Sequence, residues 1–262
     1  MLFIFIFLII AAAYCYLFTL IPLNLWYLFA WVPASITLSL LTLVLFILII
    51  IGIGCKCRPT LKWKHRLLYQ ICQLVLIVFN IHVKVVNKDK VPTVPFGMYG
   101  NHKSNLDVII DYYAAHRVCS AVGKSTLFGV GIMKSLAKCF GAVSLDRNND
   151  REAAKSIATA IKNIKSGLSM IIYPEGGIKT RETELCVDLK PGAYKMATKA
   201  NAPILPVTNL NTHTIAKKPW WKYHKVTVVF HDPIYPEEYN SMNTTELGNK
   251  VAAIIDSPVT NK

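Results

Sequence analysis

The first 55 residues of this chain contain no charged side chain, and Lys56 is the first. Two stretches in this part, residues 1–20 and 34–54, are apolar enough to form membrane helices. About 20 residues at a rise of about 1.5 Å cross a hydrocarbon layer of about 30 Å. Between them, Trp26, Tyr27 and Trp31 are residue types that favour the membrane–water boundary. We expect a membrane-anchoring helical hairpin, either spanning the bilayer or re-entering one leaflet.

Basic residues follow the second apolar stretch directly: Lys56, Arg58, Lys62, Lys64 and Arg66. Basic residues that flank a span mark its cytoplasmic side, so we expect the N-terminus and the main domain to face the cytosol. A secretory signal peptide fits poorly because nothing basic precedes the first apolar run. Residues 67–79 are apolar but too short to span, which leaves an interfacial helix and a core helix as equal alternatives.

The chain of 262 residues carries a formal charge of +14, from 29 basic and 15 acidic side chains. Anionic lipid and nucleic acid are the two natural partners of such a charge. No basic helix suited to a nucleic-acid groove and no RNA-binding signature is present, so lipid is the favoured partner. The seven cysteines have no zinc-like spacing apart from the isolated pair Cys55 and Cys57, which indicates free thiols in a reducing compartment.

Beyond residue 80, short β-type runs alternate with helical stretches, which predicts an α/β fold with a mixed, largely parallel sheet flanked by helices. The expected strands are residues 81–86, 96–99, 119–122, 142–145, 170–173, 204–207 and 226–230. The expected helices are residues 105–116, 125–139, 152–165, 193–200 and 244–255. Loops at the carboxyl ends of parallel strands collect ligand sites, and His102, Arg147 and Glu175 each follow an expected strand.

His102 and Asp107 form the pattern H-x4-D at the start of an expected helix. Residues five apart on a regular helix point about 140° away from each other. The two side chains therefore meet only if His102 lies in the entry turn and Asp107 in the first helical turn. In that arrangement the carboxylate orients the imidazole and leaves its other nitrogen free to accept a proton. A capped turn without catalytic function is the alternative.

Two further segments contain residue types suited to phosphate. Arg147 follows the strand expected at residues 142–145 and offers a planar fork of donors, or forms a salt bridge with Asp146. Glu175 and Gly176 form a turn that allows close backbone approach to a ligand.

The order of these blocks resembles the 1-acylglycerol-3-phosphate acyltransferase family of glycerolipid synthesis, over roughly residues 81–232. Four signature blocks follow one another: H-x4-D at 102–107, Leu145-Asp146-Arg147, Pro174-Glu175-Gly176, and residues 202–207 with the sequence APILPV. Residues 122–128 and 189–193 also look like the family. One block alone would be weak, but four in order with matching spacers indicate membership.

The resemblance implies transfer of a fatty acyl group from acyl-CoA or acyl carrier protein to a lysophospholipid hydroxyl, most simply that of lysophosphatidic acid. It implies that His102 is the general base, that Asp107 fixes its tautomer and that no acyl-enzyme forms. In the family, Arg147 and the block containing Glu175 and Gly176 bind the glycerol phosphate, and the prolines of the fourth block, here Pro206, shape the site. No metal and no tightly held cofactor are implied.

The third block departs from the family pattern. The family usually has Glu-Gly-Thr-Arg, whereas this chain has Ile178 at the arginine position. Ile178 cannot bind phosphate, so Lys179 or Arg181 is expected to take over, with more of the recognition resting on Arg147. Lys124 is a further candidate for positive potential, or a solvated surface lysine.

Residues 217–225, the aromatic–lysine loop, interleave aromatic and basic side chains in the sequence KKPWWKYHK. Trp and Tyr prefer the bilayer interface and Lys attracts its head groups, so a second membrane contact is one hypothesis. A loop packed on the domain is the other.

The sequence thus predicts an integral membrane acyltransferase in three parts: a membrane anchor (1–55), a basic juxtamembrane segment with an interfacial helix (56–80) and a cytosolic acyltransferase domain (81–262). The expected product is phosphatidic acid. An acyltransferase for another lysolipid and a non-enzymatic membrane-anchored lipid-binding protein are the alternatives. A lipid hydrolase is disfavoured because the nucleophile elbow Gly-x-Ser-x-Gly is absent.

Overall fold

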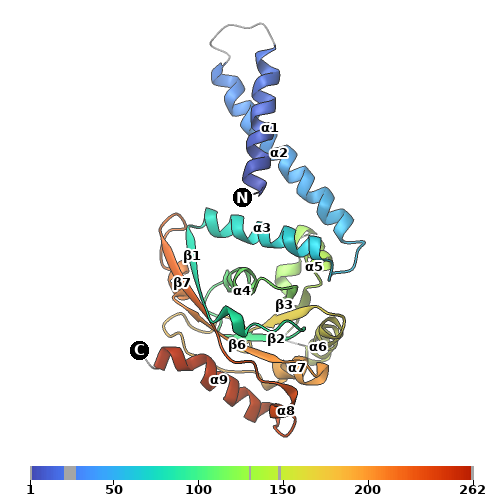
Figure 1. Cartoon of the computed structure of the whole chain (residues 1–262), viewed down its shortest axis with the longest axis vertical. Coiled ribbons are helices and arrows are strands. Elements are labelled where there is room, and N and C mark those ends of the chain that lie inside the picture. Colours follow the sequence, from blue (N-terminus) through green and yellow to red (C-terminus); the bar gives the residue numbers. More distant parts are fainter. Residues whose placement is uncertain (1, 21–27, 130, 147–148, 261–262) are drawn as a thin grey trace.

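A computed structural model of the chain describes residues 2–20, 28–129, 131–146 and 149–260. A globular α/β part carries a hairpin of two long helices that projects from one side (Figure 1). The helices are α1 Leu2–Thr19, α2 Leu28–Gly54, α3 Lys62–Val78, α4 Asp107–Ala115, α5 Gly131–Phe140, α6 Asp150–Lys165, α7 Lys195–Ala200, α8 Pro236–Tyr239 and α9 Thr244–Thr260.

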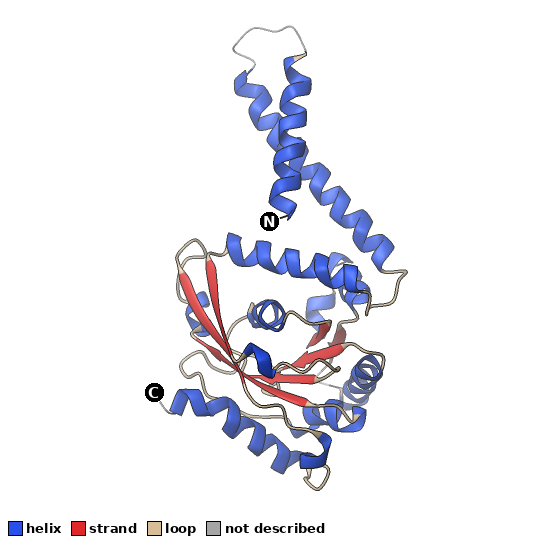
Figure 2. Ribbon diagram, viewed as in Figure 1, coloured by secondary structure: helices blue, strands red, loops and turns tan. Residues whose placement is uncertain are grey.

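Within the described residues, seven strands form one sheet in the order β1-β7-β6-β2-β5-β3-β4 (Figure 2). Among the strands described, β6 and β7 are the one antiparallel pair, so the expected mixed, largely parallel sheet is confirmed. Each strand overlaps one that the sequence predicted: β1 Ile81–Val86, β2 Gly97–Gly100, β3 Cys119–Lys124, β4 Val143–Leu145, β5 Ser169–Ile172, β6 Ile204–Leu210 and β7 His224–Phe230.

Both faces of the sheet are buried, as parallel sheets require. Side chains alternate between the faces, so Tyr99 packs into the cluster under α6, α7 and α9 while Met98 packs into the cluster under α3 and α4. In β5, Met170 and Ile171 divide in the same way. With both faces covered, the edge where the parallel strands end is left open for a site.

Helix α2 begins earlier than the sequence suggested. The expected run 34–54 starts after Pro33, but α2 begins at Leu28 and includes Pro33 in its second turn. Proline there removes one backbone hydrogen bond and does not end the helix, a situation that apolar surroundings and a neighbouring helix tolerate. The earlier start places Trp31 on α2, stacked on Phe18 of α1 at 5.9 Å. Trp26 and Tyr27 lie outside the described residues.

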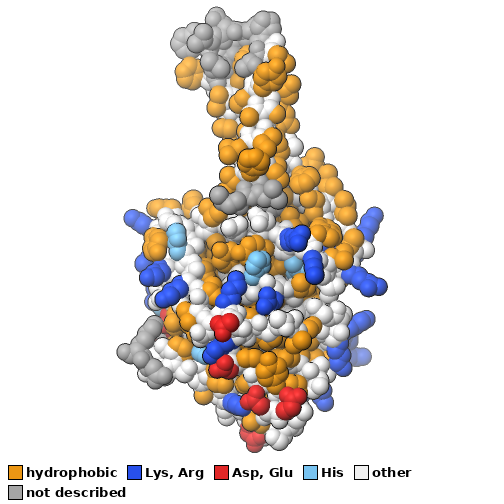
Figure 3. All heavy atoms as spheres, viewed as in Figure 1, with side chains coloured by type: hydrophobic (Ala, Val, Ile, Leu, Met, Phe, Trp, Pro, Cys, Tyr) orange, Lys and Arg blue, Asp and Glu red, His pale blue; other side chains and the backbone are white. Residues whose placement is uncertain are grey.

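The surface of the hairpin is apolar, and Lys and Arg side chains are seen only on the globular part (Figure 3). Polar side chains of the hairpin lie between its helices: Tyr14 pairs with Thr42 at 3.0 Å and Cys15 with Ser35 at 3.1 Å. The stretch Phe29–Gly54 is long and apolar enough to cross a membrane, while α1 is a shorter apolar helix. This inverted pattern, with apolar groups outside, is that of a segment whose solvent is lipid.

Helix α3 begins five residues before the expected segment 67–79 and includes basic side chains. Its inner face buries Cys72 and Leu76, whereas Ile77 and Val78 are each 49% exposed. Lys64, expected to be a basic flank of the span, is instead completely buried, and its ammonium donates to the carbonyl oxygens of Gly54, Cys57 and Cys139. The end of α2 and the turn after it supply two of these acceptors and α5 supplies the third, an arrangement that the sequence pattern did not reveal.

The helix expected over residues 125–139 is divided. A 3₁₀ turn at Ser125–Phe128 precedes α5, which begins only at Gly131. Gly129 and Gly131 are poor helix formers and account for the break. The predicted division of the chain at residues 55 and 80 stays a prediction; these positions fall between α2 and α3 and between α3 and β1.

Candidate active site

The candidate site lies where β2 and β5 end. These strands are parallel neighbours in the sheet, so the loops that follow them share one edge. His102 follows β2 and Glu175 follows β5, and the His102 N–H donates to Glu175 Oε1 at 2.8 Å. The expectation that these two residues come together is therefore confirmed. Arg147, which was expected beside them, lies outside the described residues.

The imidazole of His102 and the carboxylate of Asp107 are in contact. His102 Nδ1 lies 3.0 Å from Asp107 Oδ2, which also accepts the backbone N–H groups of Lys103 at 2.7 Å and Ser104 at 2.8 Å. Asp107 is fully buried at the first position of α4, where the helix dipole favours a negative charge. With Nδ1–H donating to this carboxylate, Nε2 keeps its lone pair.

Aromatic stacking holds the plane of the His102 ring. The ring lies on that of Tyr173, with centroids 4.3 Å apart and an angle of 10° between the planes. The imidazole is partly exposed, with 16% of its side-chain surface accessible. Stacking and the Asp107 hydrogen bond together leave the ring little freedom, which is the preorganisation that a general base requires.

Glu175 and Lys103 form a fully buried ion pair beneath the loop of His102. Lys103 Nζ donates to Glu175 Oε2 at 2.9 Å, while Oε1 accepts from the His102 backbone. Burial raises the pKa of the Glu175 carboxyl, and these two donors partly offset that effect. Both carboxylate oxygens are thus engaged within the protein, which gives Glu175 the geometry of a residue that positions His102.

A second buried carboxylate, Asp111, lies one turn after Asp107 on α4. Its Oδ2 accepts from the Tyr173 hydroxyl at 2.6 Å and from Asn209 Nδ2 at 3.1 Å. Burial, with a smaller contribution from the charge of Asp107, raises the pKa of Asp111 to about 7. Asp111 therefore fixes Tyr173, and through Tyr173 the ring of His102.

A cavity of about 630 Å³ opens beside this group. Its lining includes Tyr173, Glu175 and Gly176, and one wall is an apolar face of α6 formed by Ala153, Ala154, Ile157, Ala158 and Ile161. Lysines line it as well: Lys179, Lys190, Lys195 and Lys199. An apolar wall with ammonium groups nearby suits an amphiphile that has an alkyl chain and an anionic group.

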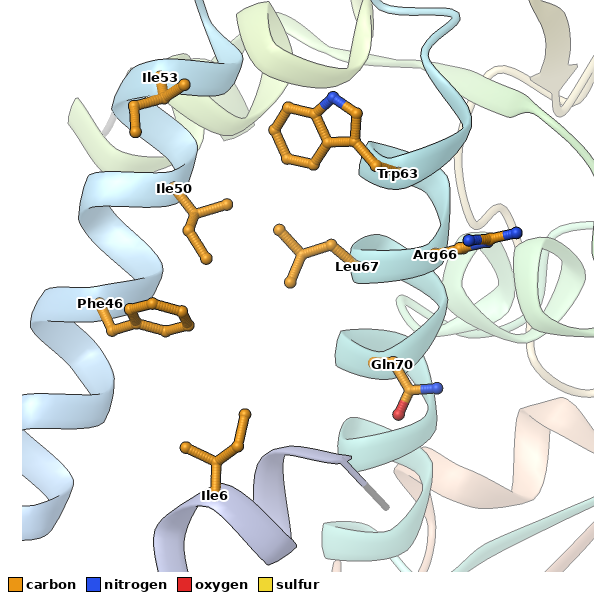
Figure 4. A pocket seen from close by; sticks show the side chains of 8 residues that line it. All are labelled: Ile6, Phe46, Ile50, Ile53, Trp63, Arg66, Leu67 and Gln70. Atoms are coloured by element: carbon orange, nitrogen blue, oxygen red, sulfur yellow. The ribbon is translucent and has the colours of Figure 1, made fainter. Parts of the chain in front are cut away.

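A second cavity, of about 610 Å³, lies between the hairpin and α3 (Figure 4). It is lined by Ile6 of α1, Phe46, Ile50 and Ile53 of α2, and Trp63, Arg66, Leu67 and Gln70 of α3. In the close-up, Trp63 and Leu67 point toward α2, whereas Arg66 points away from it. The residues lining this cavity include no imidazole or carboxylate, whereas the first cavity is lined by Glu175 and by Tyr173, on which the His102 ring stacks, so the first is the better candidate for chemistry. Among the described residues, no cluster of three metal-ligating side chains occurs.

Comparisons with known proteins agree with this geometry. A family model described as Acyltransferase matches residues 82–209, which include the His102–Asp107 and Glu175 blocks. A probable 1-acyl-sn-glycerol-3-phosphate acyltransferase of Mycoplasma genitalium is 29% identical over 222 residues, covering 78% of this chain and 80% of the relative. The 1-acyl-sn-glycerol-3-phosphate acyltransferase of Saccharomyces cerevisiae is 25% identical, covering 71% and 61%, and that of Haemophilus influenzae is 30% identical, covering 56% and 61%.

The chain contains a domain that matches the Acyltransferase family and is similar over most of its length to 1-acyl-sn-glycerol-3-phosphate acyltransferases. The crystal structure of the 1-acyl-sn-glycerophosphate acyltransferase PlsC from Thermotoga maritima shares the fold, with a TM-score of 0.65 over 76% of this chain and 80% of that one. At 21% identity this likeness concerns the fold alone.

The other acyltransferase site residues expected from the sequence differ in position. Gly176 lines the cavity and has a φ of 73°, a left-handed conformation that glycine adopts freely. Lys179 also lines the cavity and pairs with Asp188 at 3.0 Å. Lys124 is exposed at the end of β3, opposite Leu145 of the cavity wall. Their roles in substrate binding stay predictions.

Arg181 and Pro206 lie away from the cavity wall. Arg181 is half-buried, and within the described parts of the chain its Nε has no hydrogen-bond partner. Pro206 is buried within β6, opposite Tyr99 of β2. Proline has no backbone N–H to donate within a sheet. Pro206 lies just outside the paired part of β6 and β7, which ends at Val207 and Phe230, so the sheet tolerates a proline at this position.

Sequence reasoning missed Lys103, Asp111, Tyr173 and Asn209 as parts of the site. Asp111 carried a usable signal, since it lies four residues after Asp107 and hence on the same face of the helix. Lys103 and Asn209 carried none, because their partners are far away in the sequence.

Proposed function

We propose that this protein transfers a fatty acyl group from acyl-CoA or acyl carrier protein to the free hydroxyl of 1-acylglycerol 3-phosphate, giving phosphatidic acid. The observation that carries the proposal is the 3.0 Å contact of His102 Nδ1 with Asp107 Oδ2, an arrangement in which a neutral imidazole can use Nε2 as a base, on a side chain that is 16% exposed. The named activity of the Mycoplasma, yeast and Haemophilus relatives supports the choice of acceptor.

The reaction needs a base because an alcohol is a weak nucleophile near neutral pH. His102 Nε2 takes the proton as the acceptor oxygen bonds to the thioester carbonyl carbon, and the carbonyl becomes an oxyanion. Collapse of this intermediate breaks the carbon–sulfur bond, and the departing thiolate takes the proton. Asp107 stabilises the imidazolium that forms between these steps. A positioned base of this kind contributes typically about 10²–10⁴-fold.

The lysophospholipid fits the cavity by charge and polarity. Its phosphate would lie near Lys179 and Lys190, whose ammonium groups both contact Asp188, at 3.0 and 3.2 Å. Its acyl chain suits the apolar wall provided by α6. Ile178 in the place of the usual arginine favours this lysine-based recognition and makes another lysolipid acceptor the second candidate.

The hairpin α1–α2 would anchor the enzyme in the membrane that contains its acceptor. Exposed basic side chains, Lys56, Arg58 and Lys62, follow α2 and favour the cytoplasmic face for the catalytic domain. Acyl donor would reach the site from the cytosol. The proposed reaction uses no metal and no tightly held cofactor.

The proposal is tested with purified full-length enzyme, several lysolipids and both donor types, by mass spectrometry of the products. His102→Ala should lower kcat by about 10²–10⁴-fold. Asp107→Asn should lower it less, because an amide oxygen can keep the hydrogen bonds to His102, Lys103 and Ser104 while the charge is lost. Membrane attachment should be unchanged in both variants. Full turnover by His102→Ala would contradict the assignment, and a non-enzymatic lipid-binding protein predicts no product from any pair of substrates.

A further inference from the structure

The aromatic–lysine loop exposes three large aromatic side chains. Trp220 is 53% exposed, Trp221 59% and Tyr223 55%. The lysines at positions 217, 218, 222 and 225 are all exposed, and the ion pairs found among the described residues use none of them. A surface that contacts only water rarely exposes two tryptophans beside lysines without acidic partners, so this composition indicates a binding surface.

The loop is held in place although its rings are exposed. Asn80 Nδ2 donates to Trp221 O at 3.1 Å, and the His224 N–H donates to Asn80 O at 3.0 Å. The Trp220 ring meets Phe79 edge-on at 6.3 Å, and the Tyr223 ring lies 4.6 Å from His82. The rings are thus presented by an ordered backbone, so binding a partner costs little conformational entropy.

The loop lies on the side of the domain from which the hairpin projects. Helix α3 runs along this side, and β1 and β7 both start there (Figure 1). The turn after α2 leads into the first residue of α3, while Phe79 and Asn80, directly after its last residue, hold the loop. With 17 residues and about 1.5 Å per residue, α3 separates the two features by about 25 Å. Ile77 and Val78, each 49% exposed, extend the apolar surface at the loop end.

We propose that the aromatic–lysine loop is a second attachment to the membrane, and that its partner is an anionic bilayer surface. This inference rests on the membrane location proposed above. The rings enter the headgroup region, where Trp and Tyr are most stable, and the four lysines attract anionic head groups. The common side with the hairpin favours a bilayer over an acidic protein. Contacts at both ends of α3 then restrict the tilt of the catalytic domain over the membrane.

The test uses the full chain reconstituted in vesicles, with Trp26, Trp31 and Trp63 replaced by Phe so that only the loop tryptophans emit. Half of the vesicle samples contain lipids brominated in the upper acyl chain, which quench only nearby tryptophan. The structure predicts a blue shift and a loss of emission in brominated vesicles, larger with about 30% anionic lipid than with zwitterionic lipid alone. Water-like emission that bromination leaves unchanged would overturn the proposal, and an acidic protein partner predicts that result.

A matched reporter separates the two proposals. A variant retaining only Trp31, on α2, should be quenched whenever the hairpin is in the bilayer. Quenching of Trp31 without quenching of the loop defeats the second attachment alone, whereas no quenching of either reporter defeats the membrane location too. In the loop reporter, replacing the four lysines by Gln should abolish the dependence on anionic lipid. Acyl transfer in detergent verifies that each variant is folded.

Discussion

The buried pair of Lys103 and Glu175 gives the sharpest quantitative prediction. Both side chains are completely inaccessible, with Nζ and Oε2 2.9 Å apart. In Lys103→Met, Glu175 keeps only the His102 N–H as a partner for its carboxylate. Removing one partner of a buried pair costs about 3–5 kcal/mol because the remaining charge stays desolvated. For a domain of this size, about 2–4 °C per kcal/mol converts this to a fall in Tm of roughly 6–20 °C.

The double variant Lys103→Met/Glu175→Gln should recover most of that loss. Neither residue of the pair is then charged, and the Gln amide oxygen can still accept the His102 N–H. We expect its Tm to lie closer to that of the wild type than to that of Lys103→Met, a coupling that two independent sites would not show. Thermal unfolding in one detergent, followed by circular dichroism, measures all three proteins.

Lys90→Met is the matched control. Lys90 and Asp232 are also 2.9 Å apart, but their side chains are 29% and 84% exposed. An exposed pair contributes about 0–1 kcal/mol, so this variant should change Tm by a few degrees at most. Equal losses of Tm for Lys90→Met and Lys103→Met, or a loss in the double variant as large as that of Lys103→Met alone, would refute the argument.

Three further predictions concern the cavity, the buried acid and the root of the hairpin. Asp188→Asn removes the carboxylate that pairs with Lys179 and Lys190, so the KM for a phosphate-bearing acceptor should fall about two- to fivefold in initial-rate assays. An unchanged KM would exclude these two lysines from phosphate binding. Asp111 has a pKa of about 7 in the folded protein against an ordinary value of 3.8, so between these pH values the folded state binds more protons than the unfolded state. The free energy of unfolding of the wild type, measured by denaturant titration, should therefore fall relative to that of Asp111→Asn as the pH rises from about 4 to 7. Parallel pH dependences of the two proteins would contradict this. Lys64→Met removes the charged donor of three carbonyl groups, so its free energy of unfolding, measured by thermal unfolding, should fall by roughly 3 kcal/mol or more. In the control Lys62→Met, at an exposed position, it should change by no more than about 0.5 kcal/mol. Equal losses in the two variants would contradict this prediction.

The sequence alone was enough for features that arise from neighbouring residues. The seven strands were predicted because buried parallel strands are short apolar runs between turn residues. A contact of His102 with Asp107 was expected on the condition that His102 lies in the entry turn and Asp107 in the first helical turn, and the local backbone places the two residues in this way. The hairpin was evident because apolar runs of its length have few other stable environments.

Local sequence patterns predicted the wrong environment for residues whose conformation or burial depends on neighbouring elements. Pro33 looked like the end of a connecting segment, but contact between α1 and α2 keeps it inside a helix. Lys64 looked like a solvated flank, but its ammonium group is surrounded by three carbonyl groups, two from the connection before α3 and one from α5. In both cases a neighbouring element overrides the intrinsic preference of the residue.

Only the tertiary structure decided which residues support the imidazole of His102. The pair of Lys103 with Glu175 joins residues 72 apart in sequence, and the bond of Asn209 with Asp111 joins residues 98 apart. Such pairs depend on which strands become neighbours in the sheet, and no periodicity in the sequence records that order. The pattern of apolar runs in the sequence determined that the chain has an apolar helical hairpin and an α/β domain. Packing of β2 beside β5 determined which buried charges hold the imidazole in place.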